Sequence, residues 1–205
     1  KNHFKSLNYD EMPSLFEEIE ASSATTQSKL ALQFTIITCC RTTEVLNSTW
    51  DEIDLVKAVW TIPAERMKAG EPHSVPLSSA ALKILKKAHA LRSANELIFP
   101  SPIDDKPMSD GTRRKLLQKT LGVDATVHGF RSSFKDWASE TTNHPNEVSE
   151  MALAHAIGNK TEAAYRRGDL LQKRKELMQD WSDFLCNKNG KVIRLETGAA
   201  YGRRT

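Results

Sequence analysis

The stretch "SKLALQFTIITCCRTTEVLNSTW" (residues 28–50) sets a long apolar run directly before a polar, charged one. The apolar run predicts a buried helix, and Thr42 or Thr43 can cap a second helix that begins immediately after it. Arg41 therefore lies at a helix–helix junction, where a guanidinium is costly to bury unless it pairs with an anion. Glu44, three residues further on, is the internal partner at a suitable spacing. Two interpretations stay open at this point, a structural Arg41–Glu44 pair and an arginine that binds an external anion.

The rest of the chain combines several helical patterns with two short strand patterns. Apolar residues recur with a helical period in residues 9–21, 79–92, 110–122, 126–140, 147–158 and 170–185. β-Branched and aromatic runs at 49–63 and 73–78 flank a turn that contains Gly70 and Pro72, so they predict a small antiparallel sheet. Gly158 is expected to end the helix in which it lies. The predicted fold class is mainly α with a small antiparallel β-sheet (α+β).

The composition is that of one ordinary globular domain. The chain has 205 residues, of which 39% are hydrophobic and 27% are charged, and this length can bury a core. It begins with Lys1, so we expect a fragment in which residues 1–186 form one catalytic-size domain and residues 187–205 form a tail with a strand-like run, KVIRL. Apolar runs stay short of the ~20 residues of a membrane helix. Three cysteines without metal or redox spacing indicate a reducing cytosol.

Charge and motif content argue against several kinds of chemistry. The net charge of +3 does not by itself indicate a nucleic-acid partner, although residues 156–205 carry 11 Lys and Arg against 6 Asp and Glu. The chain has no H-E-x-x-H motif and no paired His and Cys spacing, which argues against a metal site. A serine nucleophile elbow and a glycine-rich phosphate loop are also missing from the sequence. We therefore expect neither a metal nor a cofactor.

The remaining candidates are cations on separate segments, followed by a tyrosine. They are Arg41, Lys68, His128, Arg131, His155 and Tyr165. Each has an ordinary explanation alone: a turn lysine is normally solvated, a histidine and an arginine three residues apart share a helix face, and a helical tyrosine usually packs. Together they suit metal-free phosphodiester transfer. Arginines and a histidine neutralise the phosphate oxygens, a lysine protonates the departing 5′-oxygen, and a cationic pocket favours a phenolate nucleophile.

Four boxes carry these residues in order: "CRTTEVLNSTWDEID" (40–54), "RMKAGEPHSVPLS" (66–78), "HGFRSSFKDWASE" (128–140) and "LAHAIGNKTEAAYRRGD" (153–169). In this order and context they resemble the tyrosine recombinase (phage integrase) family, specifically its pathogenicity-island and satellite-phage integrase branch. The resemblance covers about residues 10–186. It implies a tyrosine recombinase catalytic-domain-like fold of the DNA breaking-rejoining type.

The resemblance also implies a role for each catalytic position. Tyr165 would attack a scissile DNA phosphate to form a 3′-phosphotyrosyl link, which conserves the bond energy without ATP or a metal. Lys68 would be the general acid, and His128 would bind phosphate or assist proton transfer. The nonbridging oxygens would be held by Arg41, Arg131 and His155, with Glu44 orienting Arg41.

The implied partners follow from the same resemblance. The chain would act on double-stranded DNA attachment sites, integrating and excising a mobile element in the bacterial cytoplasm (nucleoid), with no membrane association. Further DNA contacts are expected from Arg113, Arg114, Lys115, Arg166 and Arg167. Four protomers would assemble on DNA, with the tail 187–205 docking on a neighbouring subunit, whereas the isolated domain would be a monomer. Accessory DNA-bending or directionality proteins are compatible with such a system, and N-terminal DNA-binding domains usual in the family do not lie within this chain.

Two alternatives use the same residues differently. A type IB topoisomerase shares the tyrosine chemistry but relaxes supercoiled DNA without a fixed target sequence. A non-catalytic DNA-binding module would use the basic C-terminal half to bind phosphates, and its binding would weaken steeply with salt. The complete set of six candidate residues favours the recombinase over a module that only binds.

Overall fold

The computed structural model describes residues 5–92, 96–101, 103, 106–155 and 168–186. Its α-helices are α1 (Met12–Ala21), α2 (Thr26–Thr38), α3 (Thr42–Leu46), α4 (Ser79–Ala90), α5 (Asp110–Lys115), α6 (Phe130–Thr141), α7 (Asn146–Ala152) and α9 (Leu171–Leu185). Short 3-10 turns cover Tyr9–Glu11, Trp50–Glu52 and Ala64–Arg66, and a π-helical turn, Leu116–Thr120, continues α5. The predicted α+β class is confirmed. None of the described helices is long and apolar enough to cross a membrane.

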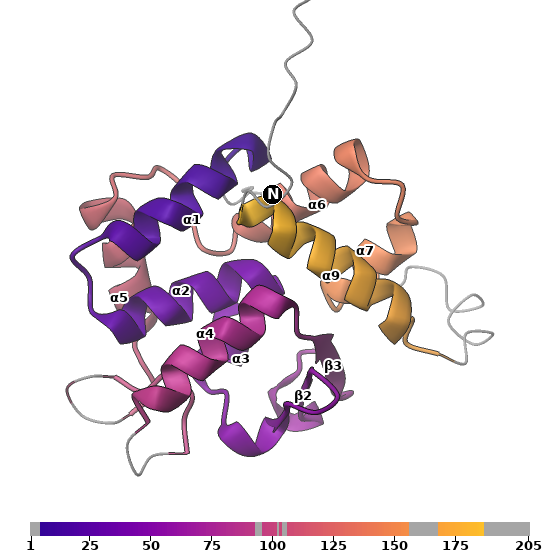
Figure 1. Cartoon of the computed structure of the whole chain (residues 1–205), viewed down its shortest axis with the longest axis horizontal. Helices are drawn as coiled ribbons and strands as arrows, with labels where there is room; N and C mark the ends of the chain where they lie inside the picture. The colour runs from indigo at the N-terminus through magenta and orange to yellow at the C-terminus, as the bar shows by residue number, and fades with distance from the viewer. Residues whose placement is uncertain (1–4, 93–95, 102, 104–105, 156–167, 187–205) are drawn as a thin grey trace, which may run out of the picture.

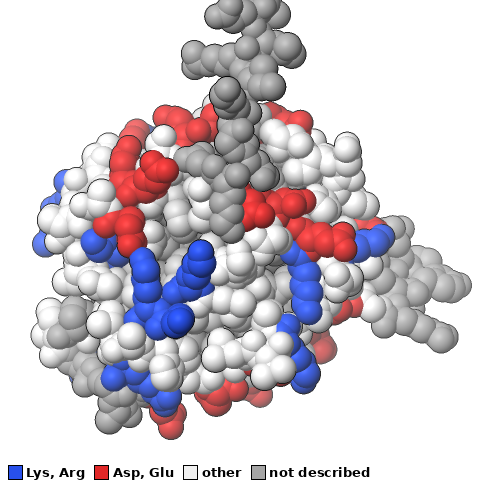
Figure 2. All heavy atoms as spheres, in the orientation of Figure 1, with Lys and Arg blue, Asp and Glu red and all other residues white. Residues whose placement is uncertain are grey.

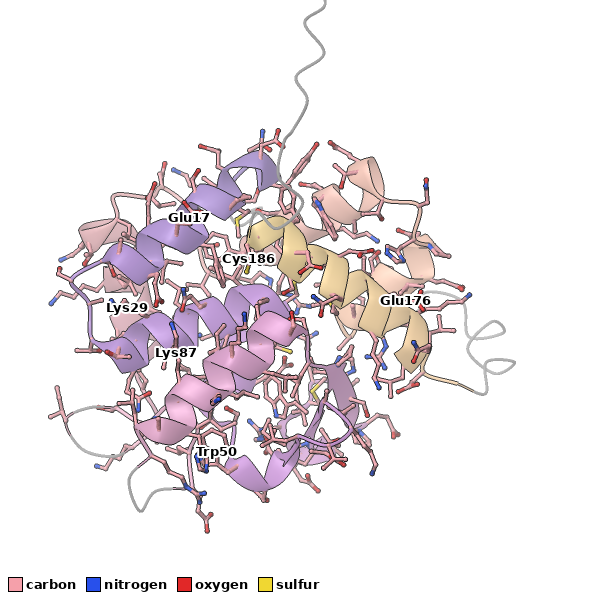
Figure 3. All side chains as sticks on the ribbon, in the orientation of Figure 1. Glu17, Lys29, Trp50, Lys87, Glu176 and Cys186 are labelled. Carbon is pink, nitrogen blue, oxygen red and sulfur yellow. The ribbon has the colours of Figure 1, made fainter. Side chains whose placement is uncertain are left out.

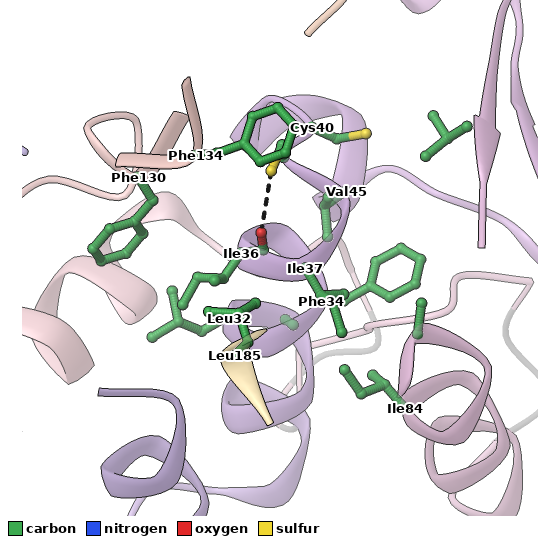
Figure 4. Close-up of a cluster of buried hydrophobic side chains, with 14 of the residues drawn as sticks. Leu32, Phe34, Ile36, Ile37, Cys40, Val45, Ile84, Phe130, Phe134 and Leu185 are labelled. Atoms are coloured by element: carbon green, nitrogen blue, oxygen red, sulfur yellow. Dashed lines mark hydrogen bonds between the residues drawn. The ribbon is translucent and has the colours of Figure 1, made fainter. Parts of the chain in front are cut away.

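Helix α2 is the centre of the domain. Ten of its thirteen residues are buried, because α1, α4, α5 and α9 all pack against it (Figure 1). Figure 4 shows Leu32 and Phe34 of α2 among the apolar side chains of its neighbours, including Ile84 of α4 and Leu185 of α9. A helix that is apolar on all sides is stable only inside a core. The long apolar run of residues 28–40 therefore determines where the other helices can lie.

An aromatic cluster joins α9 to α2 and α6. The ring of Trp181 is fully buried, lies 5.0 Å from that of Trp137 and 5.5 Å from that of Phe134 between centroids, and contacts Phe184 as well. Its indole Nε1 donates a hydrogen bond to the carbonyl oxygen of Ile36 in α2, at 3.1 Å. Trp181 thus supplies both a large buried area and a polar tie to the central helix.

The three strands form an antiparallel sheet in the order β1 (Ile53–Asp54), β2 (Val59–Ile62), β3 (His73–Pro76). Trp60 pairs with Val75 in the register of β2 and β3. The sheet lies at the lower edge of Figure 1, where β3 packs against α9. Gly70, at φ +71°, adopts the left-handed conformation that a turn between these two strands requires.

Surface charge is mixed over the face formed by α1, α4 and α9. Figure 2 shows basic side chains over α4 and acidic ones over α1 on the same face. Lys87 of α4 and Lys29 of α2, labelled in Figure 3, both bond to Glu20 at the end of α1: Lys87 Nζ lies 2.7 Å from its carboxylate, and Lys29 Nζ lies 2.8 Å from its carbonyl oxygen. The end of α1 is therefore joined to α4 by an ion pair and to α2 by a lysine–carbonyl bond.

Three expected boundaries differ from the structure. Helix α3 begins at Thr42 and Arg41 occupies its N-cap position, so the expected threonine cap is wrong. The expected helix 147–158 ends at Ala152, because Ala154 takes the left-handed conformation (φ +48°) that was assigned to Gly158. The helix predicted for 110–122 changes to a π-helical turn at Leu116. Gly158, the KVIRL run and the tail 187–205 lie outside the described residues.

β3 reaches the end of α7 through His73. Burial and the nearby charge of Arg174 lower the pKa of this imidazole to about 4, and a hydrogen bond to the backbone of Ala152 only partly opposes that shift. The ring is therefore neutral at neutral pH. It links the sheet to the helical half of the domain.

The tie between α9 and α2 can be tested with two tryptophan variants. We expect Trp181→Phe to lower the free energy of unfolding by about 2–3 kcal/mol, because it leaves a cavity and removes the indole donor from the carbonyl of Ile36, which keeps only the weak thiol donor of Cys39. Trp50→Phe is the matched control, since the buried Nε1 of Trp50 has no hydrogen-bond partner within the described part of the chain; it should cost less than about 1 kcal/mol. Urea unfolding measures both, and equal losses would contradict the assignment.

His73 predicts a pH dependence of stability. Because its pKa is about 4 in the folded chain and about 6.5 when unfolded, the unfolded chain takes up the proton first as the pH falls. Stability is then fully present above pH ~6.5 and declines toward pH ~4, by at most about 1.4 kcal/mol per pH unit. His73→Gln, which keeps a donor for Ala152, should flatten this slope in urea titrations between pH 4 and 8. An unchanged slope would show that other groups cause the loss.

Candidate active site

The last turn of α7 brings the candidate residues together. Its end is closed by two backbone bonds, from Ala154 N to Met151 O at 3.1 Å and from His155 N to Glu150 O at 3.0 Å, which is the pattern of a Schellman motif. The carbonyls of the next residues point away from the helix and lack intrahelical donors. They also form the negative end of the helix dipole, which attracts cations.

Arg131 of α6 is the most buried of these cations, at 7% exposure. Its NH2 donates to the carbonyl oxygen of Leu153 at 2.5 Å, and its NH1 donates to that of Cys39 at the end of α2. NH2 also lies 3.3 Å from Nε2 of His155. Burial lowers the pKa of this guanidinium, which stays protonated because an arginine cannot deprotonate in a protein. Arg131 therefore joins the ends of α2 and α7 beside the imidazole of His155.

Arg41 approaches the same turn from the α2–α3 junction. Its NH2 lies 3.4 Å from the carbonyl oxygen of Ala154, and its NH1 donates to Oε1 of Glu44 at 2.7 Å. The other carboxylate oxygen of Glu44 accepts the backbone N–H of Arg41, also at 2.7 Å. Glu44 is 3% exposed, whereas the Arg41 side chain is 24% exposed. The internal pair is thus present, and it leaves part of the guanidinium open to an external anion.

His128 lies in a turn directly before α6 and not on the helix face expected for it. Its carbonyl oxygen accepts the backbone N–H of Arg131 at 3.2 Å. Partial burial lowers the pKa of its ring, and the positive charges of Arg131, Arg41 and His155 lower it further. Gly129 is required here, because a Cβ would lie 2.1 Å from the carbonyl oxygen of Lys5.

Lys68 is exposed on the β2–β3 connection, one residue after the buried Met67. The base of that connection is fixed by Arg66, whose NH1 donates to the carbonyl oxygen of Glu44 at 2.9 Å and whose NH2 pairs with Glu52. The lysine thus extends from an anchored turn whose anchor also holds the partner of Arg41. Sequence reasoning missed Arg66 and Glu52, whose pairing appears only once the strands are folded.

Tyr165, Arg166 and Arg167 lie outside the described residues. On one side of them, His155 follows α7; on the other, Asp169 precedes α9 and is held by Arg174, which is 1% exposed. Arg174 binds the carboxylate of Asp169 at 2.9 Å and the carbonyl oxygen of Ser74 in β3 at 2.5 Å. His155, Asp169, Arg174, His73 and Met67 all line one hollow of about 310 Å³. The chain therefore leaves and re-enters the described structure at the same hollow.

The expected DNA contact of Arg113 is wrong in this structure. Its side chain is fully buried, with NH1 donating to Oγ1 of Thr35 at 2.7 Å and NH2 lying 3.3 Å from Asp110. A guanidinium enclosed between α2 and α5 does not reach a phosphate at the surface. Arg114 and Lys115 are exposed, as that expectation requires.

A second hollow, of about 350 Å³, lies beside the site. It is lined by Arg114, Thr42 and His128, together with other residues of α5 and the segment before α6. Three of the six predicted residues, Arg41, Arg131 and His155, meet at the end of α7, and His128 lies in the turn before α6. Lys68 extends from an adjacent turn, and the position of Tyr165 stays a prediction.

Known phage and prophage integrases are similar to this chain in sequence. The phage integrase family model matches residues 5–170. Prophage integrase IntA of Escherichia coli (strain K12) is 35% identical over 187 residues, which cover 90% of this chain and 45% of IntA. The chain thus spans about half the length of the relatives it matches.

Solved structures agree on the fold. XerH site-specific recombinase bound to difH substrate superposes with a TM-score of 0.63 at 17% identity, over 89% of this chain and 55% of that one. A lambda integrase tetramer bound to a Holliday junction gives a TM-score of 0.57 at 20% identity, over 78% and 50%. The family match covers most of the chain, including the four boxes and the cations at the end of α7. The chain belongs to the phage integrase family of tyrosine recombinases.

Proposed function

We propose that this chain is the catalytic domain of a site-specific DNA recombinase that integrates and excises a mobile element. The observation that carries the proposal is the meeting of Arg41, Arg131 and His155 at the last turn of α7. Two guanidiniums and an imidazole from three segments form a cationic cradle. Such a cradle neutralises the charge that grows on the nonbridging oxygens during phosphoryl transfer.

The reaction that we propose is a balanced transesterification. The phenolic oxygen of Tyr165 attacks the scissile phosphorus and loses its proton, and the bond from phosphorus to the 5′-oxygen breaks. Lys68 gives a proton to that oxygen, so the products are a 3′-phosphotyrosyl link and a free 5′-hydroxyl. His128, whose pKa is lowered by burial and by the cations around it, is neutral and can receive a proton. Attack by the 5′-hydroxyl of another strand reverses these steps and releases Tyr165.

The DNA partner and the assembly are part of the same proposal. XerH is described with its difH substrate and lambda integrase as a tetramer on a Holliday junction, and we extend this to double-stranded attachment sites and four protomers here. Arg114 and Lys115, exposed beside the site, would contact the DNA, as would Arg166 and Arg167. We further propose that residues 1–186 form the catalytic domain, that residues 187–205 dock on a neighbouring subunit, and that the chain works in the bacterial cytoplasm.

The proposal predicts a covalent adduct that depends on one residue. A pool of nicked duplexes with randomised sequence provides suicide substrates, because cleavage beside the nick releases a short strand and prevents religation. The chain should form a denaturant-resistant DNA adduct enriched in one sequence, and Tyr165→Phe should abolish it. Adducts formed by Tyr165→Phe would refute the assignment. Adducts without sequence enrichment, together with relaxation of any supercoiled plasmid, would favour a topoisomerase, and salt-sensitive binding without adducts would favour a binding module.

The role of Lys68 predicts rescue by a better leaving group. We expect Lys68→Ala to slow cleavage by about 10²- to 10⁴-fold, the usual contribution of a general acid. A substrate with sulfur in place of the bridging 5′-oxygen needs no proton on its leaving group, so it should restore most of the rate. His155→Gln is the control, since it weakens phosphate binding and should stay slow on both substrates. An equal defect of Lys68→Ala on both substrates would show that Lys68 acts in another way.

A further inference from the structure

The carboxylate of Glu150 lies between two cations next to the site. Its Oε2 is 2.8 Å from Nδ1 of His155, and its Oε1 is 2.6 Å from Nζ of Lys135. The side chain of Glu150 is 30% exposed and that of Lys135 is 23% exposed. The roles assigned above to the active site do not include either residue.

Several bonds hold this carboxylate in place. Lys135 of α6 donates to Oγ of Ser149 at 2.7 Å and to Oδ1 of Asn146, so it is fixed across the first turn of α7. The carbonyl oxygen of Glu150 accepts the backbone N–H of His155 at 3.0 Å. Glu150 thus binds His155 twice, once through the main chain and once through the ring.

The electrostatic balance keeps Glu150 ionised. Burial raises its pKa, but the hydrogen bonds and charges of Lys135 and His155 outweigh burial, so the net pKa is lowered. An ionised carboxylate accepts hydrogen bonds and does not donate them. The nitrogen of His155 that faces it must therefore carry a proton.

This contact selects one form of the imidazole. With Nδ1 protonated toward Glu150, the second nitrogen, Nε2, lies 3.3 Å from NH2 of Arg131 and faces the phosphate cradle. A hydrogen bond at one ring nitrogen fixes the tautomer of the imidazole and the orientation of its other nitrogen. When the ring takes up a second proton, Nε2–H becomes a donor toward a phosphate oxygen.

We propose that Glu150 is a positioning residue for strand cleavage, whose carboxylate fixes the ring of His155 so that Nε2 is aimed at the scissile phosphate. The inference rests on the proposed function and deepens it. Two members of the cradle are then oriented in the same way, because Arg41 pairs with the carboxylate of Glu44 and His155 pairs with that of Glu150. Lys135 keeps the second carboxylate from turning away.

The charged groups around His155 determine the expected pH effect. Glu150 and Lys135 lie behind it, Arg131, Arg41 and His128 lie on the phosphate side, and Asp169, Arg174 and His73 share its hollow. The carboxylate in direct contact is that of Glu150. Removing that charge changes the electrostatic surroundings of the site, so the pH profile of cleavage should differ between Glu150→Gln and the unchanged chain.

A spectroscopic experiment tests the contact without any DNA. Long-range ¹H–¹⁵N spectra of the full 205-residue chain report the tautomer of each histidine, and His155→Gln identifies the signals of His155. We expect the Nδ1–H tautomer in the unchanged chain and its loss in Glu150→Ala. Glu176→Ala, which removes an exposed glutamate of α9 (Figure 3), is the matched control and should leave the tautomer unchanged. An Nε2–H tautomer in the unchanged chain, or an unchanged spectrum in Glu150→Ala, would overturn the proposal.

A kinetic cycle tests whether Glu150 acts through His155. We expect Glu150→Ala to slow formation of the Tyr165 adduct by about 10- to 100-fold, the usual effect of removing an orienting partner, and Glu150→Gln to slow it less while shifting the pH profile. In the His155→Ala background the same change should have no further effect. Additive losses would overturn the proposal. If no chain forms an adduct although the tautomer is as expected, the proposed function fails and the Glu150–His155 contact stands.

Discussion

The structure depends on three carbonyls at the end of α7 that lack hydrogen-bond donors within the helix. Three successive residues there, Ala152, Leu153 and Ala154, accept hydrogen bonds from a histidine of β3 and from two arginines, one on α6 and one at the α2–α3 junction. A helix end lacks internal donors and carries partial negative charge, so it can gather cations that would otherwise repel each other. The sheet, the central helix and the C-terminal half meet at this turn, and the same turn lies beside the cations that we propose bind a phosphate.

The sheet contributes more than a place for Lys68. Glu52 accepts from the indole of Trp60 and from Arg66, and Arg66 in turn holds the carbonyl of Glu44. A displacement of the β2–β3 connection would therefore act on the backbone that aims Arg41. Arg174 makes a similar link on the other side of β3, because it binds both Ser74 and Asp169. The β2–β3 hairpin thus carries Lys68, contacts the residue that pairs with Arg41, and is joined through Arg174 to Asp169 before α9.

Sequence reasoning succeeded where local spacing determines the contact and failed where the fold does. The Arg41–Glu44 pair was readable from three residues of separation. Arg113 was misjudged as a surface cation, although Leu116 and Leu117 mark its helix face as buried. The end of α7 was misplaced because a glycine was expected to end the helix. The left-handed residue is instead Ala154, whose own carbonyl and that of Leu153 are bound by arginines. Glu150 could not be found, since Lys135 reaches it only from another helix.

Arg131 illustrates how closely folding and chemistry are joined in this domain. Its guanidinium donates hydrogen bonds to two carbonyls, one at the end of α2 and one at the end of α7, and also lies beside His155. A lysine carries the same charge but lacks the planar fork that can bridge both carbonyls, and each carbonyl left unpaired costs about 1–3 kcal/mol. The same side chain therefore serves the fold and the proposed phosphate cradle. A substitution of Arg131 would loosen the ends of α2 and α7 at the same time as it removed a cation from the cradle.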